Sequence, residues 1–388
     1  MTLGIGPIQW PSDIDECIFL EQFWQKKPLL IRQAFPDFVT PLPADELAGL
    51  SLEPDTSGRI IIRDGNGAYT LEHGPFAENR FVTLTDNQWS LLVTDVEKHI
   101  PEFTAYLQPF RFIPDWRIDD LMVSYAPDGA SVGAHVDEYD VFLLQGIGVR
   151  TWRIDARRDT VHQLCTDGDL KILADFKATD EWDLTAGDTL YLPPGTAHHG
   201  IAKGDDCTTW SIGFRAPRLP DFIARMAELI SDQMSPHLRY TDGPMNPSNH
   251  GEISQQSIQR FKAIWDHTTQ LGDDDFARLL GSWLTESSAL APPGNSTATA
   301  TAPVISGDTT VLQKAPFSRF AWTAQSDTAG TLFADGTAVP CSVDFARCVC
   351  SAQLWVDIAP SELTKTDTNA LKTLTNMGCL LPQDHEAQ

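Results

Sequence analysis

The stretch that decides the fold is GAHVDEYDVFLLQGIGVRTWR, residues 133–153. In it, His135 and Asp137 stand two residues apart, directly before an apolar run. Residues i and i+2 of a β-strand point to the same face, so these two side chains should converge while Val136 points away. With ten histidines in the chain, about one such pair is expected by chance. The pair is therefore a weak signal until its surroundings are considered.

A second motif supplies a third polar residue for the same place. Gly129 stands six residues before His135, and downstream the chain carries G-x5-P-x-G-x2-H at Gly187, Pro193, Gly195 and His198. A strand, a tight turn and a returning strand would bring His198 to the first pair. Two histidines and one carboxylate on one face of an octahedral metal leave positions open, an arrangement that suits non-haem Fe(II). The joint spacing disfavours the alternative of three hydrogen-bonded core residues.

His198 and His199 compete for the role of third ligand. Neighbouring residues of a strand face opposite sides, so only one of them can reach the metal. The motif spacing selects His198. His199 is then expected to support a ligand from behind or to face solvent.

Arg150 is a candidate for binding an anionic cosubstrate. It follows Asp137 by thirteen residues and shares a strand face with Trp152, while Arg153 points the other way. A guanidinium can bind a carboxylate with two parallel hydrogen bonds. Such a contact suits one end of a dicarboxylate that is held opposite a metal. An exposed strand arginine is equally compatible with the spacing alone.

The composition bounds the class of protein. The chain has 388 residues with 28 basic and 53 acidic side chains, a net charge of 28 − 53 = −25. This length predicts two or three domains. The acidic balance argues against a general nucleic-acid binder and could attract a basic protein, although solubility alone is the commoner explanation. No apolar run long enough to span a membrane and no signal peptide are recognisable.

The cysteines favour a reducing compartment. There are seven of them, an odd number, and no C-x-x-C occurs. Neither a disulfide framework nor a structural zinc site is indicated, and a cytoplasmic location fits.

Glycine and proline residues separate the expected helices and strands along the chain. Residues 12–24 are expected to form a helix, and several short strands follow up to 208–216, typical of an antiparallel barrel or sandwich. After Pro217, three amphipathic stretches predict a helical segment over 217–290. Residues 291–304, APPGNSTATATAPV, resemble a linker. Residues 305–388 mix short strands with a helix that Gly378 closes.

Six stretches together resemble the cupin superfold, and more narrowly the JmjC-type Fe(II)/2-oxoglutarate oxygenases. They are FLEQFWQKKPLLIRQAF (19–35), HGPF (73–76), NQWSLLV (87–93), FRFIPDWRIDDLMVSYAPDGASVGAHVDEYDVFLLQGIGVRTWRI (110–154), LTAGDTLYLPPGTAHHG (184–200) and WSIGFRAP (210–217). Closer still is the similarity to bacterial ribosomal oxygenases that hydroxylate an arginine of large-subunit ribosomal protein sixteen. The resemblance covers nearly all of 10–217 and is architectural beyond that point.

The resemblance implies a fold for the whole chain. We expect an α+β protein whose residues 1–216 form a double-stranded β-helix (cupin/JmjC) catalytic barrel. A helical dimerisation segment, 217–290, and a linker, 291–304, would follow. A small winged-helix-like domain, 305–388, would end the chain.

The resemblance also implies roles for single residues. His135, Asp137 and His198 match the catalytic iron ligands, and Arg150 matches the residue that holds the distal carboxylate of 2-oxoglutarate. Ser211 is assigned with Arg150 to cosubstrate binding. Asp120 and Met122 are expected to contact substrate, with Asp120 receiving a guanidinium. His199 departs from the acidic residue that close relatives carry after the third ligand.

The function implied is a 2-oxoglutarate-dependent protein hydroxylase acting on a basic ribosomal protein, as a cytoplasmic homodimer. Three alternatives stay open: a JmjC-type demethylase, another cupin dioxygenase, and a non-catalytic module that docks on ribosomes. Residues 305–388 hold five basic and nine acidic residues, a balance of 5 − 9 = −4. Because duplex binding relies on neutralised phosphates, we expect this domain not to bind nucleic acid.

Overall fold

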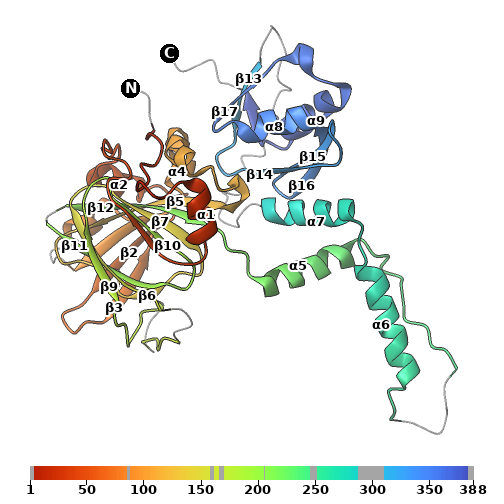
Figure 1. Cartoon of the computed structure of the whole chain (residues 1–388), viewed down its shortest axis with the longest axis horizontal. Coiled ribbons are helices and arrows are strands. Elements are labelled where there is room, and N and C mark those ends of the chain that lie inside the picture. Colours follow the sequence, from red (N-terminus) through yellow and green to blue (C-terminus); the bar gives the residue numbers. More distant parts are fainter. Residues whose placement is uncertain are drawn as a thin grey trace. The chain divides into compact units, whose positions relative to one another are not determined.

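The computed structural model of the chain describes residues 4–84, 88–157, 161–165, 170–204, 206–244, 251–286 and 310–382. These residues form two compact units (Figure 1). One unit comprises the chain up to Ala216, and the other comprises most of the chain from Pro217 onward. None of the described helices is long and apolar enough to cross a membrane.

The first unit is built on two antiparallel sheets. The larger has the order β1-β10-β7-β12-β5-β4-β2-β3. Its strands are β1 (Leu29–Ile31), β2 (Gly58–Arg63), β3 (Tyr69–His73), β4 (Trp89–Val93), β5 (Ile118–Ala126), β7 (Asp140–Gln145), β10 (Thr189–Leu192) and β12 (Cys207–Phe214). The smaller has the order β6-β11-β8-β9, with β6 (His135–Val136), β8 (Val149–Asp155), β9 (Asp180–Leu184) and β11 (Ala197–Lys203).

Some consecutive strands of the barrel belong to different sheets. β7 and β8 are joined at a glycine-containing turn, yet β7 pairs with β10 and β12 while β8 pairs with β11 and β9. At the turn, Gly148 has a φ of +68°, and a Cβ there would lie 2.0 Å from the Asp206 carbonyl oxygen. Only glycine fits so close an approach at positive φ. The same crossing between β10 and β11 brings residues of both sheets around one cavity.

Short helices pack against the larger sheet and share its hydrophobic core. They are α1 (Glu16–Gln22), α2 (Ala44–Leu50), α3 (Glu78–Val82), α4 (Val96–His99) and the 3-10 segments η1 (Pro101–Phe110) and η2 (Asp115–Arg117). The predicted helix over 12–24 is shorter than expected. Asp15 is extended and its side chain accepts a hydrogen bond from the Ile18 amide at 2.8 Å, so the helix begins after Asp15. Phe19, fully buried, packs edge-on against Tyr191.

The second unit begins with the predicted helical segment. Its helices are α5 (Leu219–Asp232), α6 (Gln255–Thr269) and α7 (Asp273–Thr285). The rest comprises β13 (Thr310–Lys314), β14 (Phe320–Ala324), β15 (Ala329–Ala334), β16 (Thr337–Ser342), α8 (Val343–Ser351), β17 (Trp355–Ile358), η3 (Pro360–Glu362), α9 (Lys365–Asn376) and β18 (Leu380–Pro382). Gly378, at φ +77°, follows α9 as predicted. The predicted linker, 291–304, lies outside the described residues.

Helix α7 packs against the sheet of β14, β15 and β16. A Cβ added at Gly281 on α7 would lie 2.4 Å from the ring of Phe333 on β15, so the glycine allows the close approach. The Gly336 amide donates to the Thr285 hydroxyl at 3.2 Å. The last predicted helix of the 217–290 segment is therefore part of the packing of the C-terminal sheet, an association that its sequence did not reveal.

Candidate metal centre and its pocket

Three side chains converge inside the barrel. His135 on β6, Asp137 just after it and His198 on β11 each offer a ligand atom, and these atoms lie within 4.8 Å of one another. The Asp137 carboxylate oxygens lie 3.9 Å from His135 Nε2 and 3.5 Å from His198 Nε2. Within the described residues, this is the one group of three or more metal-type ligands close enough to share an ion.

The backbone orients both imidazoles toward the centre. The Nδ1 of His135 lies 3.0 Å from the Gly133 carbonyl oxygen, and the Nδ1 of His198 lies 2.9 Å from that of Thr196. A carbonyl oxygen only accepts, so each Nδ1 carries the proton and each Nε2 presents a lone pair to the centre. Burial and the neighbouring His135 lower the pKa of His198 to about 4, which keeps it neutral. Neutral imidazole is the form that binds metal.

The second motif is tied to the first by the backbone. The Gly195 amide donates to the Asp137 carbonyl oxygen at 2.8 Å, and Gly195 takes a φ of +83° in the turn before β11. His198 pairs with His135 across the β6–β11 ladder, and their ring centroids lie 4.3 Å apart. The turn therefore sets which residue of β11 reaches the centre.

His199 faces away from the three residues. Its ring packs edge-on against Phe176, with 6.1 Å between centroids. Burial and the nearby Arg153 lower the pKa of His199 to about 4. His199 thus helps to hold the segment around Phe176 on the outside of the sheet.

The three residues lie in a pocket of about 400 Å³. Arg150 on β8 lines it and is 3% exposed, with its guanidinium 5.7 Å from the centroid of the Trp152 ring. Its Nε and Nη2 find no hydrogen-bond partner among the described residues. Unsatisfied buried donors are costly, so an acceptor from a ligand is expected there.

The Trp152 ring, beside Arg150, leaves room only for a small residue at Gly200 on the neighbouring strand β11. A Cβ added at Gly200 would lie 2.7 Å from the Trp152 ring. The ring also lies 5.7 Å from that of His198, centroid to centroid. The indole therefore supports Arg150 and His198 together.

The other predicted site residues also line the pocket. They are Asp120 and Met122 on β5, and Ser211 on β12, which is the register partner of Met122; Ser124, which alternates with the first two along β5, lines the pocket as well. Burial, Glu97 and Asp119 raise the pKa of Asp120 well above its usual range. A Cβ at Gly213 would lie 2.6 Å from Asp120 Oδ1, so this glycine leaves room for the carboxylate.

Sequence reasoning missed several residues of the same pocket. Arg59 and Ile61 on β2, Tyr139 after Asp137, and Lys171 all line it. Burial and the Asp137 and Asp120 carboxylates raise the pKa of the Tyr139 hydroxyl, so it stays a donor. Tyr139 is two residues from Asp137, a spacing that could have flagged it. No signal marked Arg59, because its strand precedes the motifs by some seventy residues.

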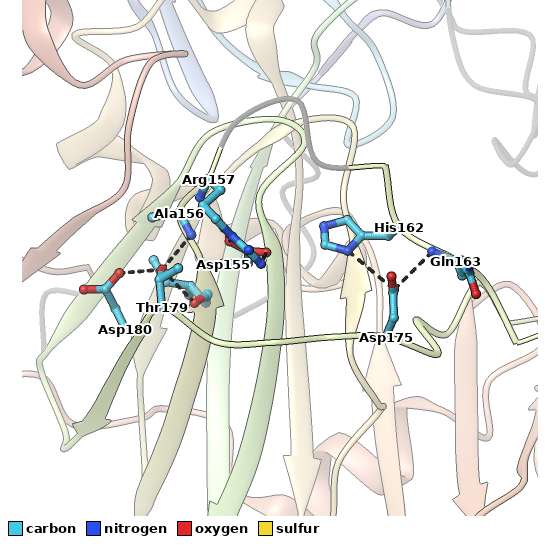
Figure 2. Close-up of polar contacts among 9 residues, drawn as sticks. Asp155, Ala156, Arg157, His162, Gln163, Asp175, Thr179 and Asp180 are labelled. Carbon is cyan, nitrogen blue, oxygen red and sulfur yellow. Dashed lines mark hydrogen bonds and ion pairs between the residues drawn. The ribbon is translucent and has the colours of Figure 1, made fainter.

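A polar segment borders the smaller sheet without joining the metal centre. Arg157 Nη2 lies 2.5 Å from the Asp155 carboxylate, and the Thr179 hydroxyl accepts a hydrogen bond from the Ala156 amide and donates one to Asp180 (Figure 2). Separately, Asp175 accepts from the Gln163 amide at 3.1 Å and lies 3.8 Å from His162 Nδ1 (Figure 2). These contacts fix the two ends of the segment whose residues Leu170, Lys171 and Ile172 line the pocket.

Comparison with known proteins agrees with this arrangement. The family profile described as JmjC domain matches residues 105–222, which include all three convergent residues and Arg150. This chain contains a JmjC domain. Its barrel is the JmjC/cupin fold, as the sequence predicts.

Two curated relatives extend the match. The ribosomal protein uL16 3-hydroxylase of Escherichia coli (strain K12) is 35% identical over 258 residues, which is 66% of this chain and 66% of the relative. A probable ribosomal oxygenase of Haemophilus influenzae is 35% identical over 261 residues, 66% of this chain and 64% of that relative. The chain thus aligns with about two thirds of each relative's length.

Solved structures cover more of the chain. YcfD, a ribosomal oxygenase from Escherichia coli, superposes with a TM-score of 0.75 at 26% identity, over 97% of this chain and 100% of that one. The same protein was solved in complex with cobalt and 2-oxoglutarate, with the same TM-score, identity and coverage. This JmjC-domain chain therefore shares its overall fold with a ribosomal oxygenase.

Proposed function

We propose that this JmjC-domain chain is an Fe(II)- and 2-oxoglutarate-dependent oxygenase that hydroxylates a ribosomal protein. The observation that carries the proposal is the convergence of His135, Asp137 and His198 beside the unpaired, buried donors of Arg150. The names of the relatives, an oxygenase and a uL16 3-hydroxylase, support the reaction class.

The donor set fits Fe(II). Two neutral imidazole nitrogens and one carboxylate oxygen from residues of both motifs match the facial arrangement of non-haem iron oxygenases. Both histidines have their second nitrogen held by a carbonyl, which fixes the tautomer that a metal requires. We assign His135, Asp137 and His198 as the ligands, and the Arg150 guanidinium as the partner of the distal carboxylate of 2-oxoglutarate.

Ser211 joins Arg150 as a proposed cosubstrate contact. Its side chain lies on β12 and is 6% exposed in the same pocket. A hydroxyl can donate to a carboxylate and accept from a neighbour, so it suits either end of the cosubstrate. The apolar wall of the pocket excludes water around both.

Bound Fe(II) would supply dioxygen activation, so that substrate, oxygen and 2-oxoglutarate give hydroxylated substrate, succinate and carbon dioxide. The protein's own contribution is placement. Arg150 would fix the cosubstrate, and Asp120 with Met122 would hold the target side chain. Tyr139, as a donor beside Asp137, would keep the carboxylate of that ligand oriented.

We propose an arginine side chain as the target, by way of Asp120. Its carboxyl lies among acids, with Glu97 and Asp119 as neighbours. A cationic guanidinium entering the pocket would favour ionisation of Asp120 and pair with it. A net charge of −25 also suits a basic ribosomal protein such as uL16, and such an enzyme would work in the cytoplasm.

The helices α5, α6 and α7 are proposed to form a homodimer interface with a second copy of the chain. Apolar side chains from all three line one groove, among them Phe222, Met226, Phe261, Trp265 and Phe276. Trp265 is 60% exposed and Phe261 55% exposed. Scattered exposed apolar residues do not form so large an apolar surface, and a contiguous one is typical of an association site.

The domain division that we propose follows the sequence: 1–216 catalytic, 217–290 for dimerisation, 291–304 linker and 305–388 winged-helix-like. The last part is proposed to act without binding nucleic acid, since its acidic residues outnumber the basic ones by nine to five.

Cosubstrate turnover tests the proposal. The Fe(II)-loaded protein should convert 2-oxoglutarate to succinate faster when uL16 is added, and chelation of iron should stop it. Formaldehyde should not appear, because hydroxylation releases none whereas demethylation does. Turnover that ignores uL16, or release of formaldehyde in step with succinate, would contradict this function.

A further inference from the structure

Arg59 is a partly buried cation that lines the pocket, and the proposed function assigns it no task. It lies on β2, and with Ile61 it faces the pocket. Its Nη2 approaches the Met122 sulfur at 3.6 Å. Its Nε is buried and has no hydrogen-bond partner among the described residues.

These contacts leave the guanidinium poorly satisfied. A thioether sulfur is a weak acceptor, and a guanidinium carries five N–H donors. A buried donor without an acceptor destabilises the protein by the full cost of its lost hydration. An arginine held in this state is ready for an oxygen acceptor that a ligand brings.

Arg59 and Arg150 lie on different sheets of the barrel. Arg150 lies on β8 of the smaller sheet over Trp152. Arg59 lies on the larger sheet, against Met122, and acts electrostatically on Tyr139. It therefore belongs to the side of the pocket proposed to hold the substrate, beside Asp120 and Met122.

The charge of Arg59 decides what it can bind there. A guanidinium side chain of the substrate would be repelled by Arg59, and that side chain is proposed to pair with Asp120. The remaining acceptor that any polypeptide offers beside its target residue is a main-chain carbonyl oxygen. A hydrogen bond from a charged donor to a carbonyl oxygen is strong. It would distinguish a peptide from a free amino acid only through the position of that carbonyl.

We infer that Arg59 is a further substrate-binding residue, whose guanidinium donates a hydrogen bond to a main-chain carbonyl oxygen of the polypeptide, next to the residue that enters the pocket. The inference rests on the proposed function and adds a fixed point for the substrate backbone. Asp120 would then hold the side chain and Arg59 the backbone, so that the target carbon is placed by two contacts.

Equilibrium binding tests the inference without turnover. The protein is loaded with Mn(II) and 2-oxoglutarate in the absence of oxygen, and its affinity for purified uL16 is measured. Arg59→Ala should weaken uL16 binding by about tenfold or more, the effect of truncating a hydrogen bond to a charged donor. Arg59→Lys should keep part of the affinity, since it retains a charged donor.

Arg63→Ala is the matched control. Arg63 lies four residues farther along the same strand, with its guanidinium 5.9 Å from the centroid of the Tyr69 ring. It is absent from the pocket lining, so its loss should leave uL16 affinity within about twofold, since surface substitutions are usually small. Affinity for 2-oxoglutarate, measured by tryptophan quenching, reports an intact pocket in every variant. Arg59→Gln serves if Arg59→Ala does not fold.

The outcomes separate the possibilities. Unchanged uL16 affinity in folded Arg59→Ala would overturn the inference and leave the proposed function standing. An equal loss of 2-oxoglutarate affinity would make Arg59 a cosubstrate contact instead, and would overturn it too. Failure of the unaltered protein to bind uL16 would remove the proposed substrate and the inference together.

Discussion

His198 and His199 are consecutive in the chain but have opposite surroundings. One is 2% exposed beside Asp137, and the other packs on Phe176. The alternation of a strand and the hydrogen bond from Gly195 to Asp137 explain the difference. At the scale of single residues, the proposed iron site depends on which histidine faces Asp137, and the proposed cosubstrate site depends on the Arg150 donors that have no partner among the described residues.

Replacement of the two histidines should have unequal effects. His198→Ala removes one of three proposed ligands and should abolish Fe(II) binding and succinate formation. His199→Ala should retain much of both. Metal content by atomic absorption, with succinate measured in parallel, checks this. Loss of iron in His199→Ala together with full iron in His198→Ala would reverse the assignment.

Arg150→Ala should raise the KM for 2-oxoglutarate by well over tenfold with iron still bound. Truncating one partner of a buried, hydrogen-bonded charge pair costs about 2–5 kcal/mol. Arg153→Ala is the control, because Arg153 is on the same strand but pairs with Glu181 on the exposed side. Steady-state kinetics in both variants decide, and a KM that stays near the unaltered value in Arg150→Ala would remove this residue from the site.

Single residues were predictable where a motif fixed their spacing. His135, Asp137 and His198 could be named because strand alternation and the glycine-marked turns locate them, whereas the roles of Arg150 and Asp120 came with the family resemblance. Tyr139 was missed although its spacing from Asp137 could have flagged it, and Arg59 could not be named, since its position depends on which strands become neighbours. Pairing between β2 and β4, and between β4 and β5, brings Arg59 to Met122, and no local pattern contains that information.

At the scale of elements, short helix α4 has a buried acid facing the pocket strand β5. Glu97 accepts the Leu121 amide at 2.9 Å and lies near Lys98. Burial raises the pKa of Glu97 to about 7. The carboxyl therefore stabilises the folded protein at low pH, through its bound proton, and this contribution is lost as pH rises through 7.

Glu97→Gln should remove this pH dependence. A shift from 4.5 to about 7 corresponds to about 3 kcal/mol. Between pH 5 and pH 8, the free energy of unfolding of the unaltered protein should fall relative to Glu97→Gln, which keeps the acceptor for the Leu121 amide. Urea unfolding at several pH values measures it. Glu102→Gln, an exposed acid on η1, is the control, and parallel pH profiles in all three proteins would disprove the expectation.

The amphipathic helices α5, α6 and α7 carry the proposed dimer. Trp265→Asp on α6 places a charge on the exposed apolar groove and should convert the dimer to a monomer of 42.9 kDa. Light scattering at micromolar concentration is the measurement. Glu252→Gln, before α6, should leave the mass unchanged. A monomer for the unaltered chain at the same concentration would exclude the interface.

The elements themselves were largely predictable, and their partners were not. The strands and the three helices after Pro217 follow from apolar periodicity and from glycine and proline. The predicted start of α1 at residue 12 was wrong by several residues because Asp15 caps the helix. The crossing of β7 to β8 between sheets, and the packing of α7 on β14–β16, are set by non-local contacts that periodicity does not encode.

At the scale of the whole molecule, the acidic charge and the barrel pocket fit one kind of partner. A net charge of −25 favours encounter with a basic protein. Asp120 and Arg150 both line the pocket, where we propose that the first binds a cationic side chain and the second an anionic cosubstrate. Together they support a hydroxylase of a basic ribosomal protein over a docking module, which would not need a convergent ligand set.

The most direct test is the mass of the substrate protein. Purified uL16 is incubated with the Fe(II)-loaded protein, 2-oxoglutarate and oxygen, and then examined by intact and tandem mass spectrometry. The account predicts a gain of one oxygen atom, located on an arginine side chain, that requires 2-oxoglutarate and is absent with His135→Ala. An unmodified uL16 despite iron-bound, 2-oxoglutarate-bound protein, or a loss of mass by one methylene group, would contradict it.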